Sequence, residues 1–162
     1  MTDAIRTRSI LALTFVATSL ALSGCSLLGG SESATDPQPS ATENSNVFTI
    51  QVGDCLNDGG SDGEVSEVPT VPCSEPHDSE AYASITMDDD EFPGQQAAEE
   101  QARLDCAAAF DDFVGLDYQS STFDPAYYFP TKTSWANGDR EILCLIVDPA
   151  GKVTGSLKGA AR

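Results

Sequence analysis

Basic residues and histidine are scarce in this sequence. Its 162 residues include 26 Asp and Glu but only 8 Lys and Arg and a single His, which gives a formal net charge of −18. Binding to nucleic acid depends on cations that displace counterions from phosphate, so this balance excludes unassisted nucleic-acid binding. Peripheral attachment to anionic lipid through a basic surface is disfavoured for the same reason. The length fits one domain, with or without a tail.

The sequence also lacks the spacings that mark common metal and redox sites. No two cysteines form a Cys-x-x-Cys motif, so neither a zinc knuckle nor a thioredoxin-type redox site is indicated. Two acidic runs, Asp58–Glu64 and Asp88–Glu91, do not have the spacing of an EF-hand calcium loop. Charge runs of this kind are usually solvated surface. We therefore expect no metal site and no cofactor.

The apolar run near the N-terminus is too short to span a membrane. Ile10–Leu22 has 13 residues, whereas a helix needs about 20 to cross the bilayer core. Arg6 and Arg8 precede the run, and the whole segment has the length and the basic N-terminal flank of a signal peptide. Residues 1–24 are therefore predicted to be a signal that directs export.

The residues that follow indicate lipidation. Leu22-Ser23-Gly24-Cys25 matches the bacterial lipobox, in which the cysteine thiol accepts a diacylglycerol and becomes the new N-terminus. Ordinary secretory cleavage after Ser23 is the alternative. Two acyl chains are enough for stable anchoring, where one alone is marginal. We expect Cys25 to tether the mature protein to the extracytoplasmic side of the cell membrane.

Composition then separates a tether from a domain. Residues 26–46 consist mainly of Ser, Thr, Gly, Glu, Asp, Asn and Pro, and they cannot bury enough apolar surface to offset their conformational entropy. The predicted organisation is an acylated cysteine with a flexible tether at 25–46 and a domain at 47–162.

Within the domain, hydrophobic patterns predict several strands and one long helix. The helix places small and aromatic residues on one stripe at spacings of three and four, and the last strand has no polar alternation, as in a buried strand. Asn137-Gly138 is typical of a hairpin turn before that strand. The expected elements are strands at Val47–Val52, Val65–Val71, Ala81–Met87 and Glu141–Val147, and a helix at Gln95–Val114. The fold class is α+β, a small antiparallel sheet covered by one helix.

Four cysteines remain once Cys25 is assigned to lipidation. An even number in an exported chain indicates two disulfides more often than free thiols. Three connectivities are possible. We favour Cys55–Cys73 and Cys106–Cys144, because each of these pairs joins neighbouring elements in the expected layout.

Several motifs resemble a known family of small envelope proteins. The similarity lies in Val52-Gly53-Asp54-Cys55-Leu56, Val71–Glu80, Trp135–Arg140 with Cys144 downstream, and Gly155-Ser156-Leu157-Lys158-Gly159. In this order they resemble the septum formation family, secreted or lipid-anchored proteins of high-GC Gram-positive bacteria. The four paired cysteines fall where that family has them. The resemblance implies a role around septum formation or envelope assembly and carries no catalytic residues.

The single histidine admits two interpretations. His77 lies among Glu75, Asp78 and Glu80, so it could act as a base oriented by Asp78 in an envelope hydrolase or transferase. Adjacent residues rarely point the same way, however, and the preceding proline indicates a turn. The structural interpretation is favoured, in which Asp78 bonds backbone amides and His77 braces the loop.

Aromatic residues in the second half offer a recognition surface. Tyr127, Tyr128 and Trp135 could stack on a glycan or peptide, with His77 and Arg140 as further surface residues, although aromatics in a small domain also form core. Arg140 is expected to pair with a carboxylate.

The sequence therefore predicts a non-enzymatic interaction module, anchored in the membrane, with an unidentified envelope protein or cell-wall partner and no nucleic acid. An enzyme that uses His77 is the alternative. Calcium binding by the acidic loops is a third hypothesis.

Overall fold

The computed structural model describes residues 43–59 and 63–162. The expected signal peptide, Cys25 and most of the expected tether lie outside the described residues, so these assignments stay predictions. Within the described ranges, no helix combines the length and apolar character needed to cross a membrane. The ranges contain an α+β fold with one antiparallel sheet, one long helix and two disulfides, as the sequence predicted.

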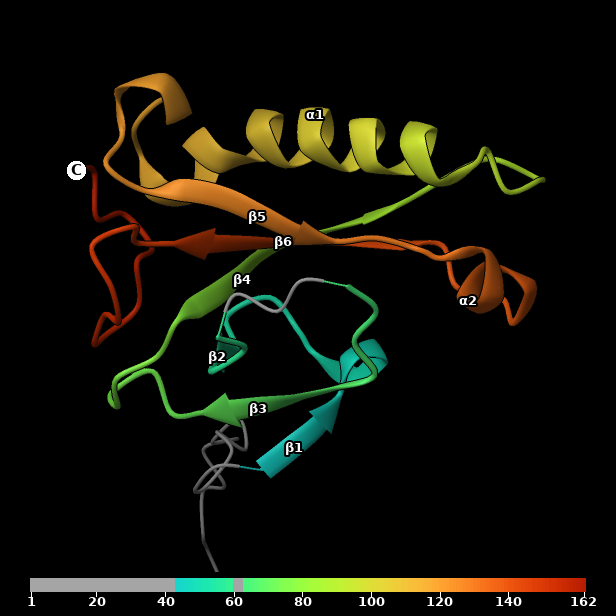
Figure 1. The fold of residues 1–162 in the computed structure, drawn as a ribbon. Helices are drawn as coiled ribbons and strands as arrows, with labels where there is room; N and C mark the ends of the chain where they lie inside the picture. Colours follow the sequence, from blue (N-terminus) through green and yellow to red (C-terminus); the bar gives the residue numbers. More distant parts are fainter. Residues whose placement is uncertain (1–42, 60–62) are drawn as a thin grey trace, which may run out of the picture. The chain divides into compact units, whose positions relative to one another are not determined.

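The described strands form one sheet in which every neighbouring pair is antiparallel. The order across the sheet is β1-β3-β2-β4-β6-β5 (Figure 1). The strands are β1 (Glu43–Asn46), β2 (Cys55–Leu56), β3 (Glu67–Val71), β4 (Ser79–Thr86), β5 (Asp124–Tyr128) and β6 (Glu141–Val147). The bounds of β6 are those predicted, and β6 lies inside the sheet between β4 and β5.

The helix α1 (Gln95–Val114) has the predicted bounds and packs on β4, β5 and β6 (Figure 1). Its predicted stripe is buried, with Ala98 and Phe110 fully covered. Gly115 ends the helix in the left-handed conformation at φ 78°, which costs glycine little. The helix-side core joins this stripe to apolar residues of the sheet, among them Tyr82, Ile142, Cys144 and Ile146.

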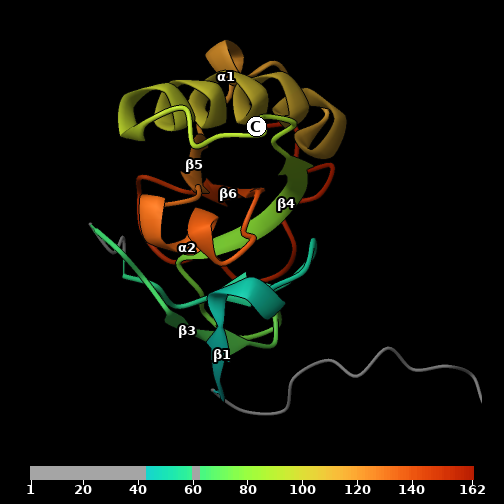
Figure 2. The same ribbon diagram turned by 90° about the vertical axis from the view of Figure 1, so that its right-hand side faces the viewer.

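A second, smaller core occupies the other face of β6. Leu143 and Leu145 alternate along β6 with the helix-facing residues, and they pack in one cluster with Val68 of β3. In sheet order, β2 and β4 separate β3 from β6. The sheet must therefore curl, and in Figure 2 β1 and β3 lie on the opposite side of β4 and β6 from α1.

The expected strand at Val47–Val52 is not formed. Val47–Thr49 is instead a 3₁₀ turn, η1, and the Asn46 side chain accepts a hydrogen bond from the Phe48 amide at 3.0 Å. This turn buries Val47 and Ile50 together in the second core, which two residues three apart on a strand could not do. The strand β1 precedes the turn and pairs with β3, so four residues expected in the tether belong to the sheet.

The connection between β5 and β6 also differs from the expected hairpin. The two strands do pair antiparallel, but a short helix, α2 (Lys132–Ala136), joins them. Thr131 and Ser134 cap this helix reciprocally, each hydroxyl accepting from the other residue's backbone amide at 3.1 and 2.9 Å. The Asn137-Gly138 turn is present, but it ends a helix. A second 3₁₀ turn, η2 (Tyr118–Ser120), precedes β5.

The disulfides join the two cysteine pairs that the sequence favoured. Cys55 of β2 is bonded to Cys73, just beyond β3, with a Cα–Cα distance of 5.2 Å. Cys106 of α1 is bonded to Cys144 of β6, at 5.4 Å. The second disulfide is fully buried in the helix-side core, whereas Cys73 is half-buried.

Candidate functional site: an aromatic and acidic groove

A groove of about 780 Å³ is lined by residues of the edge strand β5 and of the segment between β2 and β3. Its apolar lining includes Tyr127, Tyr128 and Phe129 from β5 and the residue after it, together with Phe48 of η1 and Val65. Polar side chains of α1, α2 and β6 complete the lining. The volume lies in the range of about 300–1,000 Å³ that is typical of ligand sites. This groove is the candidate functional site.

The two tyrosines of the groove lie on opposite faces of the sheet, as strand alternation predicts. Tyr127 packs against the helix-side core with its ring centroid 6.0 Å from that of Phe129. Tyr128 packs against the second core, and its hydroxyl donates to Asp58 Oδ2 at 2.8 Å. Burial raises the pKa of both hydroxyls, and the negative charges of Glu99 near Tyr127 and Asp58 near Tyr128 raise it further. Both hydroxyls are therefore neutral at physiological pH.

Trp135 and Arg140 do not line the groove. The Trp135 ring is 6% exposed and packs against Phe92 in the helix-side core. The Arg140 guanidinium lies 3.7 Å from the Trp135 ring centroid, and its Nη1 donates to the carbonyls of Trp135 and Asp139 at 2.9 and 2.7 Å. Within the described ranges no ion pair involves Arg140, so the expected carboxylate partner is not found there. Arg140 closes the turn after α2 by stacking on the indole.

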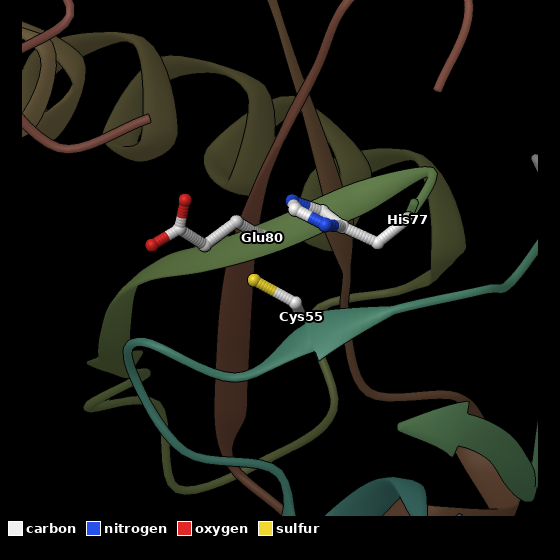
Figure 3. Close-up of side chains that lie close together, drawn as sticks. All are labelled: Cys55, His77 and Glu80. Atoms are coloured by element: carbon white, nitrogen blue, oxygen red, sulfur yellow. The ribbon is translucent and has the colours of Figure 1, made fainter. Parts of the chain in front are cut away.

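His77 is fully buried and does not line the groove either. Its backbone bonds Val153 in both directions at 3.0 Å, and its Nδ1 lies 2.9 Å from the Glu75 carbonyl oxygen. Because a carbonyl only accepts, Nδ1 is the donor in this hydrogen bond. Nε2 has no hydrogen-bond partner among the described residues. Figure 3 shows the ring beside the Cys55 sulfur and the Glu80 side chain.

Glu80 holds the C-terminal segment onto β4. Its carboxylate is 1% exposed and accepts from the Ser156 hydroxyl and from the Leu157 amide, each at 2.6 Å. These two hydrogen bonds compensate the burial of the charge. We name the set of His77, Glu80, Val153, Ser156 and Leu157 the clamp. It joins the two segments around residues 77–80 and 153–157, which lie far apart in the sequence.

Cys55, His77 and Glu80 lie close together, but their donor atoms do not suit a metal ion. Donor atoms of Cys55, His77 and Glu80 lie within 4.8 Å of one another. The Cys55 sulfur is bonded to Cys73, however, and a disulfide sulfur is not the thiolate that binds metals. Two donors remain, whereas zinc sites use three or four protein ligands.

In the catalytic hypothesis Asp78 orients His77, but the Asp78 carboxylate has other partners. The Asp78 carboxylate accepts from the Gly59 amide at 3.1 Å and pairs with Lys152 at 2.8 Å, so its described partners do not include the imidazole. Asp78 and His77 instead hold backbone turns, as the structural interpretation expected. Glu80 and Ser156 were not identified as partners, because no local pattern joins residues 76 positions apart.

The acidic loop after β2 contains a further motif. Gly59-Gly60-Ser61-Asp62-Gly63 matches the letters of the Gly-x-Ser-x-Gly pattern of hydrolases, in which the serine lies between a strand and a helix. Here the flanking elements are the strands β2 and β3, so the context that gives the pattern its meaning is missing. Residues 60–62 lie outside the described ranges. Calcium binding by this loop stays a prediction.

Comparison with known proteins identifies a matching family model and similar proteins. A model described as septum formation matches residues 22–144, which includes Cys25 and the four paired cysteines. The chain is 28% identical over 132 residues to "Putative lipoprotein LppN" of Mycobacterium tuberculosis, and equally to a protein of the same name in Mycobacterium bovis. The alignment covers 78% of this chain and 70% of each relative. No solved structure matches the chain significantly.

Proposed function

The chain belongs to the septum formation family, and from that premise we propose that it is a non-enzymatic, lipid-anchored protein of the cell envelope. Its domain acts as an extracytoplasmic interaction module in septum formation or envelope assembly, and the groove is its binding surface. Anchoring keeps the domain near the membrane and raises its effective concentration toward a partner located there.

Three observations support the anchor. The lipobox Leu22-Ser23-Gly24-Cys25 follows a short apolar run with basic flanks, as in a lipoprotein signal peptide. The LppN relatives, which align over most of this chain, carry the word lipoprotein in their names. The family match also extends back to residue 22, inside the lipobox.

The observation that carries the binding role is the contrast between the groove and the histidine. Tyr127 and Phe129 line an open groove, whereas His77, the only histidine of the chain, is fully buried in the clamp. The hydroxyls of Thr131 and Ser134 at the groove are engaged in the cap of α2. An envelope hydrolase that uses His77 would need substrate to reach a side chain with no exposed surface. Recognition by the groove requires no such rearrangement.

Mass spectrometry of protein purified from the membranes of its native host tests the anchor. We expect a mature N-terminus at Cys25 that carries diacylglycerol, and a protein that sediments with membranes. The matched control is Cys25→Ala, which cannot be acylated and should appear without lipid in the soluble fraction. A wild-type protein that retains residues 1–24 and carries no lipid would contradict the proposal.

A further inference from the structure

Carboxylates dominate the charged lining of the groove. Glu64, Glu99, Asp139 and Glu141 line it, and within the described ranges no Lys or Arg does. A concave surface lined by one sign of charge concentrates counter-ions of the opposite sign. The groove therefore favours cationic ligands and disfavours anionic polymers.

Of the cations near the groove, Arg103 and Arg140 already have partners. Lys132 of α2 makes no ion pair with the described residues and does not line the groove. Arg103 of α1 pairs with Glu100, outside the groove, at 2.6 Å. Arg140 is stacked on Trp135 and bonded to backbone carbonyls. The carboxylate of Glu99 is exposed on the same helix and lines the groove.

Aromatic rings lie beside these carboxylates. Tyr127 and Phe129 form one ring pair, and the Phe48 side chain of η1 is 55% exposed although it is apolar. Aromatic faces attract Lys ammonium and Arg guanidinium groups and also pack against their aliphatic stems. The combination of aromatic faces with carboxylates suits basic side chains better than neutral ones.

We propose that the groove binds an extended peptide segment rich in lysine or arginine, supplied by an envelope protein. This inference rests on the proposed function and names the chemistry of its partner. The partner's basic side chains pair with the groove carboxylates and lie over the aromatic rings. The chain's own residues 26–42 are not the occupant, because they contain acids and no base.

The sheet favours an extended conformation for this segment. Among the described strands, β5 is at the edge of the sheet and pairs only with β6. An edge strand leaves backbone groups that an added strand can pair with, which is a common mode of peptide recognition. Side chains of an extended segment project alternately, so basic residues at every second position fall on one face.

Titration calorimetry on the full chain in micelles of an uncharged detergent tests whether the groove binds a basic peptide. The probe is an acetylated, amidated peptide with alternating Lys and Thr, and its control has Gln at every Lys. We expect the Lys peptide to bind at least about tenfold more tightly than the Gln peptide, and to lose about fivefold or more in affinity between 50 and 300 mM salt.

Two substitutions on α1 locate the effect. Glu99→Gln removes a groove carboxylate and should weaken binding of the Lys peptide by about fivefold. The matched control is Asp112→Asn, an exposed acid on the same helix about 20 Å away, which is more than a Debye length and should leave affinity unchanged.

The outcomes separate this inference from the proposed function. Equal affinity for both peptides, or no binding of the Lys peptide, overturns the basic chemistry. Equal losses from Glu99→Gln and Asp112→Asn overturn it too, because the effect would then be net charge alone. If both peptides bind equally and Tyr127→Ala abolishes both, the groove remains the binding surface. If Tyr127→Ala changes nothing, the groove as binding surface fails as well.

Discussion

The clamp and the groove both bring together acids and ring side chains, but in opposite environments. In the clamp, Glu80 and His77 are sealed from solvent, and both are tied to the C-terminal segment. In the groove, the Glu99 side chain is exposed and the Tyr127 side chain is half-buried beside it. The first arrangement joins two parts of the chain, whereas the second leaves its groups available to a partner.

The contrast between the clamp and the groove indicates where in this domain a binding function is located. A histidine surrounded by carboxylates suggests catalysis in the sequence, yet its burial and backbone bonds give it a role in folding. Trp135 is part of the core, whereas Tyr127 and Tyr128 pack against the two cores and also line the groove. The clamp should therefore determine stability, and the groove should determine binding.

The largest effect on stability is expected from Glu80→Ala. The substitution leaves the Leu157 amide and the Ser156 hydroxyl without their charged acceptor, and the free energy of unfolding should fall by about 3–5 kcal/mol. Urea titration followed by the fluorescence of Trp135 measures it. The matched control is Glu75→Ala at an exposed neighbouring acid, which should change stability by less than about 0.5 kcal/mol. Similar small effects from both variants would contradict the clamp.

Loss of the disulfide beside the clamp should have the next largest effect. Replacing both Cys55 and Cys73 by Ala removes a cross-link between residues 18 positions apart in the sequence. The free energy of unfolding should fall by about 3 kcal/mol. Affinity for the Lys peptide should stay within about twofold, because neither cysteine lines the groove. A loss of binding larger than the loss of folded protein would show that the two regions are coupled.

Alkaline pH should destabilise the domain through its buried tyrosines. Burial raises the pKa of Tyr82 well above its ordinary value near 10. The protonated form is thus favoured in the folded state, and its contribution is fully present below pH 10 and is lost as pH rises above 10. Between pH 9 and 11 the free energy of unfolding should fall by about 1 kcal/mol from Tyr82 alone.

The tyrosine variants identify the source of this pH dependence. Tyr82→Phe and Tyr128→Phe should each remove a comparable part of the fall between pH 9 and 11, because the pKa of both hydroxyls is raised well above its ordinary value. An unchanged pH profile in Tyr82→Phe would show that other groups are responsible.

The smallest effect on stability is expected from Tyr127→Ala in the groove. The ring is half-buried at the edge of the sheet, so its truncation should cost less than about 1 kcal/mol. Binding of the Lys peptide should nevertheless be lost. Glu80→Ala should show the reverse, with reduced stability and unchanged affinity in the fraction that remains folded. A variant series in which stability and affinity fall together would break the comparison.

The parts of the fold that could be predicted are those with a long periodic signal. The 20 residues of α1 repeat their small and aromatic stripe several times, and the apolar run of β6 leaves it no exposed face, so both elements have the predicted bounds. The Cys106–Cys144 pairing followed from placing these two elements next to each other, and the Cys55–Cys73 pairing from placing the strands that flank the acidic loop side by side.

The misses have local and long-range causes. At Val47–Thr49, β-branched residues indicated a strand, but a capping side chain and burial in the second core outweighed that propensity. At α2, the reciprocal cap between Thr131 and Ser134 nucleates a helix too short to show periodicity. The clamp and the groove each combine residues from distant segments. No pattern along the chain could therefore reveal the contacts of His77 or the set of carboxylates that line the groove.

Position-specific photocrosslinking in living cells of the native host tests the separation of clamp and groove most directly. A photoreactive phenylalanine analogue replaces Tyr127 in the groove or Thr154, an exposed residue on the C-terminal segment of the clamp. We expect a discrete protein adduct from position 127 and none from position 154. An adduct from position 154 with none from position 127 would contradict that separation.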